Sequence, residues 1–135
     1  MRAVVADASA LIEYLLRTPR APLLAAIVEA PGVSLHVPAL CDVEVAAVLR
    51  RALLTKRLDE GRAREALIDY FDLPITRHGH AALVARILQL RDNFSAYDAT
   101  YAALAETLGA SFVTADDALA RAARTHLSIA VHAAP

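Results

Sequence analysis

The chain has 135 residues, of which 57% are apolar, and its 14 basic and 15 acidic side chains leave a formal net charge of −1. This length predicts one domain over residues 1–135 with a buried core, and the near-neutral charge excludes general polyanion binding by the whole molecule. Cys41 is the only cysteine, which excludes an internal disulfide and favours a reducing, cytoplasmic location. The longest run without charge, Ala30–Cys41, is far too short to cross a bilayer, so no membrane association is expected.

Short apolar strands alternate with amphipathic helices along the chain, which is typical of an α/β fold with a parallel sheet. In chain order, the pattern predicts strands at Ala3–Ala6, Leu35–Val37, Asp72–Ile75, Ser111–Thr114 and Ile129–His132. It predicts helices between them at Ser9–Leu16, Ala21–Glu29, Ala39–Leu54, Glu60–Tyr70, Gly79–Arg91, Ala96–Leu108 and Asp117–Ala123. Neither a GxGxxG nor a P-loop motif is present, which argues against dinucleotide and P-loop nucleotide sites.

Four acidic residues lie at the ends or on the apolar faces of these predicted elements. Asp7 and Asp116 follow the first and fourth strands, at the end where open parallel sheets bind ligands. Glu44 and Asp98 interrupt the apolar faces of the third and sixth helices. Buried carboxylates are costly unless they are paired, hydrogen-bonded or bound to a cation, and Mg²⁺ and Mn²⁺ prefer oxygen ligands. The four acids therefore predict a divalent-metal site suited to phosphodiester hydrolysis.

Helix capping is the alternative explanation for three of these acids. Asp7 and Asp116 stand where Asp commonly caps a helix, and the segments Ser95–Asp98 and Thr114–Asp117 both have capping-box spacing. Glu44 lies too far inside its predicted helix to be a cap. Capping alone does not explain why all four acids are directed to one edge of the sheet.

Basic residues gather at the end of the third predicted helix and in the connection after it, from Arg50 to Arg64. This cluster is either a solvated surface or a phosphate-contacting rim beside the acidic site, and charge alone does not separate the two. The candidate nucleic-acid contacts are Arg50, Arg51, Arg57 and Arg62.

The histidines give a weaker signal than the acids. His78-Gly79-His80 is the one pair with metal-like spacing, but it is expected at a turn before a helix with no third ligand nearby. His36, His126 and His132 are expected at strand ends or on the surface. No Cys–His nucleophile pair or G-x-S-x-G motif is evident.

Four segments of the chain carry a combined pattern: Asp7-Ala8-Ser9-Ala10-Leu11, Pro38 followed by Glu44-Val45, the segment Ser95–Ala105, and Phe112-Val113-Thr114-Ala115-Asp116. In their order and separation they resemble a PIN domain, and more closely the VapC-type ribonuclease toxins of bacterial toxin–antitoxin pairs. The resemblance covers nearly the whole chain.

The resemblance implies a three-layer α/β/α fold with a central parallel sheet in the order 3-2-1-4-5. It implies that Asp7, Glu44, Asp98 and Asp116 are catalytic acids that bind Mg²⁺ or Mn²⁺. The hydroxyl groups of Ser9 and Thr114 match supporting positions of that family's site, and Asp117 is an extra acid beside the fourth ligand. The implied substrate is RNA, cleaved to a 5′-phosphate and a 3′-hydroxyl.

The implied partners are a VapB-type antitoxin and a second copy of the chain in a homodimer. The early helix Leu11–Leu16 and the helix Ala39–Leu54 are candidates for the antitoxin groove, although their apolar residues also suit a core. Alternative functions are a housekeeping PIN nuclease without an antitoxin, an inactive PIN binding module, and an α/β phosphoacceptor domain in which Asp7 accepts a phosphoryl group. The phosphoacceptor alternative leaves Glu44 and Asp98 without a role.

Overall fold

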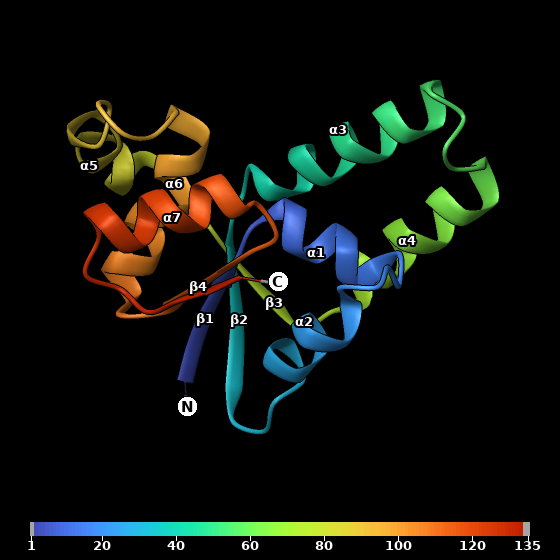
Figure 1. Cartoon of the computed structure of the whole chain (residues 1–135), viewed down its shortest axis with the longest axis horizontal. Helices are drawn as coiled ribbons and strands as arrows, with labels where there is room; N and C mark the ends of the chain where they lie inside the picture. The colour runs from blue at the N-terminus through green and yellow to red at the C-terminus, as the bar shows by residue number, and fades with distance from the viewer. Residues whose placement is uncertain (1, 134–135) are drawn as a thin grey trace.

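A computed structural model describes residues 2–133 as one parallel sheet with helices on both faces (Figure 1). The strands, in the spatial order β3-β2-β1-β4-β5, are β1 (Arg2–Ala6), β2 (Val33–Pro38), β3 (Ile75–His78), β4 (Ser111–Thr114) and β5 (Val131–Ala133). The helices are α1 (Ala8–Leu15), α2 (Ala21–Val28), α3 (Cys41–Leu54), α4 (Glu60–Asp72), the 3₁₀ helix η1 (Ala81–Leu83), α5 (Val84–Gln89), α6 (Ala96–Leu108) and α7 (Asp117–His126). The expected α/β fold and strand order are confirmed.

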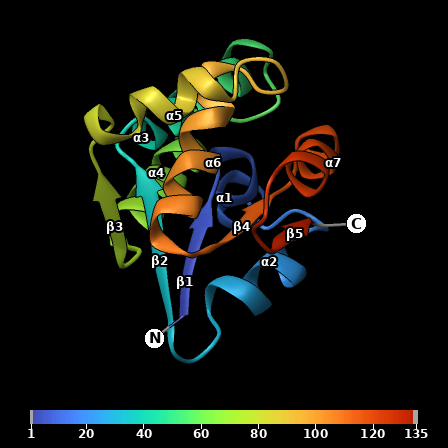
Figure 2. The same ribbon diagram turned by 90° about the vertical axis from the view of Figure 1, so that its left-hand side faces the viewer.

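The helices divide between the two faces of the sheet according to the direction in which the chain crosses it. The chain moves from β1 outward to β2 and β3, then returns to β4 and β5 on the other side of β1. Because crossovers between parallel strands are right-handed, this reversal moves the helices to the opposite face. Helices α1 to α4 therefore lie on one side of the sheet and α5 to α7 on the other (Figures 1 and 2).

Helix α6 packs closely on the sheet because its side chains are mostly small. Every residue from Ala99 to Ala105 is buried, and the helix contacts β1, β2 and β4. Gly109 ends the helix in the left-handed conformation with a φ of 60°, which a residue without Cβ adopts without strain. The chain then turns directly into β4, so the start of α6 is fixed above the carboxyl ends of the strands.

Helix α1 belongs to the core on the opposite face. Leu11, Ile12 and Leu15 are buried in the main apolar cluster. Of the two explanations offered for the apolar residues of this helix, antitoxin groove or core, the core explanation is therefore confirmed for these three residues. An apolar groove does run between α3 and α4, where Leu49, Leu53 and Leu67 are among the lining residues of a cavity of about 460 Å³.

The third strand lies further along the chain than the sequence pattern predicted. Helix α4 continues to Asp72, and Leu73 leaves the helical region with a ψ of 140° because it precedes Pro74. The strand therefore begins at Ile75, which pairs with Leu35 of β2. The prediction of a strand at Asp72–Ile75 is corrected to Ile75–His78.

The helix predicted at Gly79–Arg91 is interrupted. Its first turn is the 3₁₀ helix η1, and α5 follows without a side-chain cap. His80, which precedes η1, accepts a hydrogen bond at Nε2 from the backbone N–H of Leu40 at 3.0 Å. This contact ties the start of the segment to the connection between β2 and α3.

Smaller shifts occur at other element ends. Helix α3 begins at Cys41 and α7 extends to His126, while β5 begins at Val131, the residue that pairs with Phe112. Within residues 2–133, no helix has both the length and the apolar character needed to cross a membrane.

Candidate functional site

The carboxyl ends of β1 and β4 border a pocket of about 260 Å³ that contains all four predicted acids. Parallel pairing aligns Ala6 of β1 with Val113 of β4, so the acids that follow these two strands reach the same edge of the sheet. Helices α3 and α6 supply the other two acids. The lining residues are Asp7, Ala8, Ser9, Glu44, Ala47, Val48, Asp98, Tyr101, Asp116 and Leu119.

Asp7 caps α1 and is also tied to β4. Its Oδ1 accepts hydrogen bonds from the Ala10 N–H at 2.9 Å and from the Ser9 hydroxyl at 2.6 Å. Its Oδ2 accepts a hydrogen bond from the Thr114 hydroxyl at 2.5 Å. The capping explanation is therefore correct for Asp7, but it accounts for only one of these three bonds.

Burial governs the protonation of Asp7, whose relative exposure is 5%. Loss of solvation raises its pKa to about 6, although the hydrogen bonds from Ser9, Thr114 and Ala10 act in the opposite direction. The charge of Asp98 raises the pKa further. A bound cation would therefore stabilise the ionised form of this buried carboxylate.

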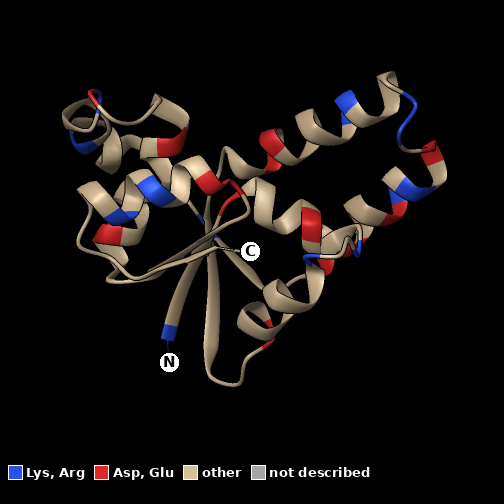
Figure 3. Cartoon of the chain, viewed as in Figure 1, with Lys and Arg blue, Asp and Glu red and all other residues tan. Residues whose placement is uncertain are grey.

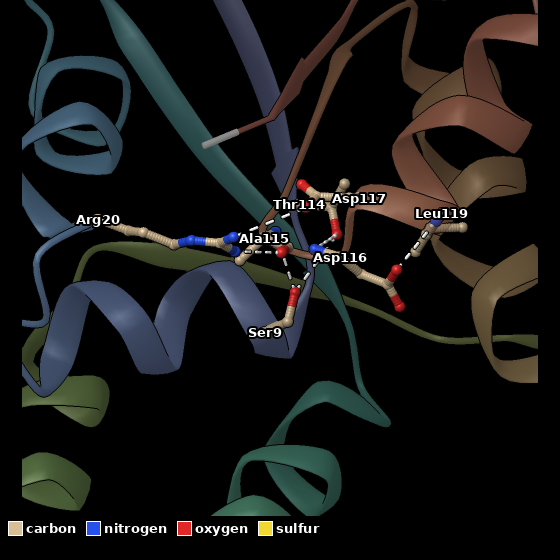
Figure 4. Close-up of polar contacts among 7 residues, drawn as sticks. All are labelled: Ser9, Arg20, Thr114, Ala115, Asp116, Asp117 and Leu119. Atoms are coloured by element: carbon tan, nitrogen blue, oxygen red, sulfur yellow. Dashed lines mark hydrogen bonds and ion pairs between the residues drawn. The ribbon is translucent and has the colours of Figure 1, made fainter. Parts of the chain in front are cut away.

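Ser9 and Thr114 connect the two strand ends through a network of hydrogen bonds. The Ser9 hydroxyl accepts a bond from the Ala115 N–H at 3.1 Å and lies 3.3 Å from the Thr114 hydroxyl oxygen. Thr114, which is fully buried, accepts a bond from the Asp116 N–H at 3.0 Å. The two hydroxyl groups thus support Asp7. They also hold the loop that carries Asp116 (Figure 4).

The adjacent acids Asp116 and Asp117 have different surroundings. Asp116 caps α7 by accepting the Leu119 N–H at 3.0 Å, and its carboxylate points toward Leu119 and away from Arg20 (Figure 4). Asp117 instead lies 3.7 Å from the Arg20 guanidinium, which also donates to the Ala115 carbonyl at 2.6 Å. Asp116 lines the pocket and Asp117 does not.

Glu44 and Asp98 enter the pocket from helices. Glu44 accepts a hydrogen bond from the Tyr101 hydroxyl at 2.6 Å. The prediction that Glu44 is not a helix cap is confirmed, because the N-cap position of α3 is Leu40 and no side chain caps this helix. Helix α3 begins at Cys41, so Glu44 lies in its first turn. Asp98 does not cap α6 either, because Ser95 does, by accepting the Asp98 N–H at 3.1 Å.

The two helix-borne carboxylates repel each other and their neighbours. Partial burial raises the pKa of Glu44, and the charge of Asp98 raises it further. Partial burial likewise raises the pKa of Asp98, with a further contribution from the charge of Asp116. The pocket therefore holds carboxylates at the cost of mutual repulsion, which a divalent cation would relieve.

The donor set fits Mg²⁺ or Mn²⁺ in chemistry, because it consists of carboxylate and hydroxyl oxygens around one small pocket. As the side chains stand, no three His, Cys, Asp or Glu residues of the part of the chain that the structure describes are close enough to hold one ion. The repulsion described above is a physical reason for this open arrangement. The residues that would hold a cation are Asp7, Glu44, Asp98 and Asp116.

The arginine cluster does not line this pocket. Arg50 and Arg51 are exposed on the second half of α3, and Arg57 is exposed in the connection to α4. Basic segments of α3 and of this connection are seen where the two helices extend away from the sheet (Figure 3). Arg62 differs from these three because its guanidinium donates to the Leu15 carbonyl at 2.7 Å. Arg62 thus joins α4 to α1.

Two histidines, His36 and His78, form a separate pair on β2 and β3, whereas His126 ends α7 and His132 lies in β5. Nδ1 of His36 lies 2.9 Å from Nε2 of His78, and His36 also contacts the Ser34 hydroxyl at 2.9 Å. The sequence pattern placed His78 at a turn before a helix. In the structure it is instead the last residue of β3. The H-x-H spacing therefore reflects two different structural roles, since His80 binds the backbone of Leu40.

Two residues of the site region were not identified from the sequence. Tyr101 lines the pocket and binds Glu44, and its position three residues after Asp98 on the same helix was the available signal. Arg20 holds the loop between β4 and α7 from outside the pocket. No local pattern links Arg20 to that loop, because the two are distant in sequence.

Comparisons with known proteins agree with this architecture. The family model described as PIN domain matches residues 4–125. Ribonuclease VapC9 of Mycobacterium tuberculosis is 43% identical over 113 residues, which are 84% of this chain and 85% of that protein.

Solved structures show the same fold at low sequence identity. The crystal structure of Mycobacterium tuberculosis VapC20, described as a sarcin-ricin loop cleaving toxin, has a TM-score of 0.68 at 15% identity and covers 88% of this chain and 94% of that one. The structure of VapBC2 from Rickettsia felis, bound to a DNA fragment from their promoter, has a TM-score of 0.69 at 10% identity and covers 97% and 98% of the two chains.

Proposed function

The chain belongs to the PIN domain family and to its VapC ribonuclease group, and from this membership we propose that it is the toxin of a toxin–antitoxin pair, an endoribonuclease that uses Mg²⁺ or Mn²⁺. The observation that carries the proposal is the convergence of Asp7, Glu44, Asp98 and Asp116 on one pocket at the carboxyl ends of β1 and β4. The ribonuclease name of the relatives supports RNA as the substrate.

Asp7, Glu44, Asp98 and Asp116 would hold a divalent ion, which would supply Lewis-acid activation of a water molecule and neutralise charge on the phosphate. Asp7, Asp98 and Asp116 are the proposed direct or water-bridged ligands. Ser9 and Thr114 keep Asp7 oriented through their hydrogen bonds. Glu44 is proposed to contact a second ion or to orient the attacking water. Its raised pKa suits the second of these roles, because a base works best when its pKa is near the working pH.

Single-stranded RNA is the proposed substrate form, because an unstacked strand brings its backbone into a small recessed pocket more easily than a duplex does. Products with a 5′-phosphate and a 3′-hydroxyl follow from the family resemblance. Arg50, Arg51 and Arg57 are proposed to contact phosphates outside the pocket, since their side chains are exposed. Arg62 is a weaker candidate because its guanidinium already donates a hydrogen bond to the Leu15 carbonyl.

The proposed partner is a VapB-type antitoxin, and VapBC2 is a solved toxin–antitoxin neighbour with this fold. The apolar groove between α3 and α4 is the proposed place for an antitoxin helix. We also propose that the protein forms a homodimer, that residues 1–135 make up a single domain, and that it is located in the cytoplasm. A phosphoacceptor role for Asp7 is disfavoured, because it gives no function to Glu44 and Asp98, which line the same pocket.

A cleavage assay on labelled single-stranded RNA tests the proposal. We expect cleavage to stop in EDTA and to return when Mg²⁺ or Mn²⁺ is added in excess. Full cleavage in chelator would overturn the metal-dependent mechanism, and no cleavage with any divalent ion would overturn the ribonuclease assignment. Co-expression with the product of the neighbouring upstream reading frame separates a toxin from a housekeeping nuclease, since only a toxin should be inhibited by it.

A further inference from the structure

Two buried tyrosines donate hydrogen bonds to carboxylates in the first turn of α3. The Tyr101 hydroxyl of α6 donates to Glu44 at 2.6 Å, and the Tyr70 hydroxyl of α4 donates to Asp42 at 2.7 Å. Both side chains are almost fully buried, with relative exposures of 2% and 0%. The two tyrosines are therefore alike in burial, and each donates to a carboxylate, although Asp42 is also paired with Arg77 at 2.9 Å. Only Glu44 and Tyr101 line the acidic pocket.

The position of Tyr101 connects two of the pocket acids. It lies three residues after Asp98, so the same side of α6 carries Asp98 and the hydroxyl that binds Glu44. The Tyr101 ring is held in the core, where it packs against Phe112 of β4 with ring centroids 6.4 Å apart. A rigid buried ring gives its hydroxyl a fixed position, which a flexible surface side chain would not have.

Glu44 needs such an anchor because its environment favours movement out of the pocket. The side chain is only half-buried, and the negative charge of Asp98 repels it. Rotation toward solvent would relieve both the repulsion and the partial loss of hydration. The Tyr101 hydroxyl opposes this rotation with a short hydrogen bond to an ionised group, which is among the stronger kinds of hydrogen bond.

We propose that Tyr101 is a positioning residue of the site: its hydroxyl holds Glu44 inside the pocket against repulsion from Asp98, and thereby sets how well the four acids bind a divalent ion and how fast RNA is cleaved. This inference rests on the proposed metal-dependent ribonuclease function.

Tyr101→Phe removes the hydroxyl and leaves the ring in the core, and Tyr70→Phe is the matched control outside the pocket. For Tyr101→Phe we expect a loss of about 10- to 100-fold in kcat or in Mn²⁺ affinity, with KM for RNA changed less than about twofold. Tyr70→Phe should leave both quantities near their parent values. Mn²⁺ binding is measured by calorimetry in the absence of RNA, so that one readout does not depend on activity.

A double-mutant cycle with Glu44→Gln identifies the route of the effect. If Tyr101 acts through Glu44, then Tyr101→Phe should weaken Mn²⁺ binding in the parent and produce no further weakening in the Glu44→Gln background. Equal weakening in both backgrounds would overturn the proposal, as would parent-like kinetics and Mn²⁺ binding in Tyr101→Phe. Equal losses in Tyr101→Phe and Tyr70→Phe would also overturn it, by showing a general packing effect.

Failure of the underlying function has a different signature. If the parent cleaves no RNA, or if its cleavage survives both EDTA and Glu44→Gln, then the proposed function fails and this inference fails with it. If the parent is metal-dependent and sensitive to Glu44→Gln, yet indifferent to Tyr101→Phe, only the role of Tyr101 is lost.

Discussion

The strand side and the helix side of the pocket hold their carboxylates in different ways. Asp7, at the end of β1, accepts hydrogen bonds on both oxygens from a backbone N–H and two hydroxyl groups. Glu44, on α3, is held by the hydroxyl of Tyr101. On the strand side, Asp7 is therefore held by three hydrogen bonds that form with the fold, whereas on the helix side Glu44 is held by one.

The largest expected effect compares two neighbouring acids on the strand side. Asp116→Asn should lower RNA cleavage at least about 100-fold, because it removes one of the pocket charges while Asn still caps α7. Asp117→Asn should retain near-parent activity, since Asp117 pairs with Arg20 outside the pocket. Single-turnover cleavage rates of the two variants measure the difference. Comparable losses in both would show that the loop, and not the pocket charge, matters.

The strand side also predicts how stability depends on pH in the absence of metal. The pKa of Asp7 is about 6 in the folded protein against an ordinary value of 3.8, so the unfolded chain loses this proton first. Folding stability should therefore fall as pH rises from about 4 to 6, by up to about 3 kcal/mol for this group, and stay low above that range. Urea unfolding in EDTA at pH 4.5 and pH 7 measures the change.

Asp7→Asn is the matching test, because it removes the titration while keeping the size of the side chain. Its stability should change less between pH 4.5 and pH 7 than that of the parent. A pH dependence as steep as the parent's would mean that other groups control the trend and that burial of the Asp7 charge costs little.

On the helix side, Asp98→Asn should raise the melting temperature of the metal-free protein at neutral pH by a few degrees. The substitution removes repulsion among the pocket acids, and Ser95 continues to cap α6. The variant should also respond less to Mg²⁺ than the parent, in which bound ion adds stability by mass action. Thermal melts with and without Mg²⁺ are the measurement. A lower melting temperature with a parent-like Mg²⁺ response would assign Asp98 to helix stability instead.

The smallest expected effects concern the arginines outside the pocket. Neutralising Arg50, Arg51 or Arg57 with Gln should weaken RNA binding and reduce the slope of log affinity against log salt by about 0.7 for each RNA phosphate that the variant no longer neutralises. Arg62→Gln should instead lower the free energy of unfolding by about 1 kcal/mol, since it breaks the bond to the Leu15 carbonyl. If the salt slope is unchanged in the first three variants, these arginines do not contact RNA phosphates.

The sequence predicted the sheet and the acids well because both depend on short local patterns. The strand Ser111–Thr114 and the helix Ala96–Leu108 were predicted with their observed bounds. The strand order came from the family resemblance, and the pairing of β1 with β4 confirms it. The third strand was misplaced because one apolar residue borders Pro74 on each side, Leu73 and Ile75, and this pattern does not show on which side the strand begins.

The parts of the site that escaped prediction are contacts between distant elements. The bond from Tyr101 to Glu44 joins α6 to α3, and the bond from Arg20 to the Ala115 carbonyl joins the start of α2 to the β4–α7 loop. Periodicity reports which side of a helix is apolar, but it does not report which residue of another helix that side meets. The family resemblance separated Asp116 from Asp117, and only Asp116 lines the pocket, but nothing in the sequence indicated that Asp117 pairs with Arg20.

The bond between Thr114 and Asp7 has a consequence for the order of events during synthesis. These residues are 107 positions apart, and Asp7 gains its support on Oδ2 only when β4 is in place beside β1. A growing chain that ends before residue 111 contains Asp7, Glu44 and Asp98 but neither Asp116 nor the strand that aligns them. The complete acidic pocket therefore assembles late, after most of the chain has been made, and incomplete chains are expected to be inactive on RNA.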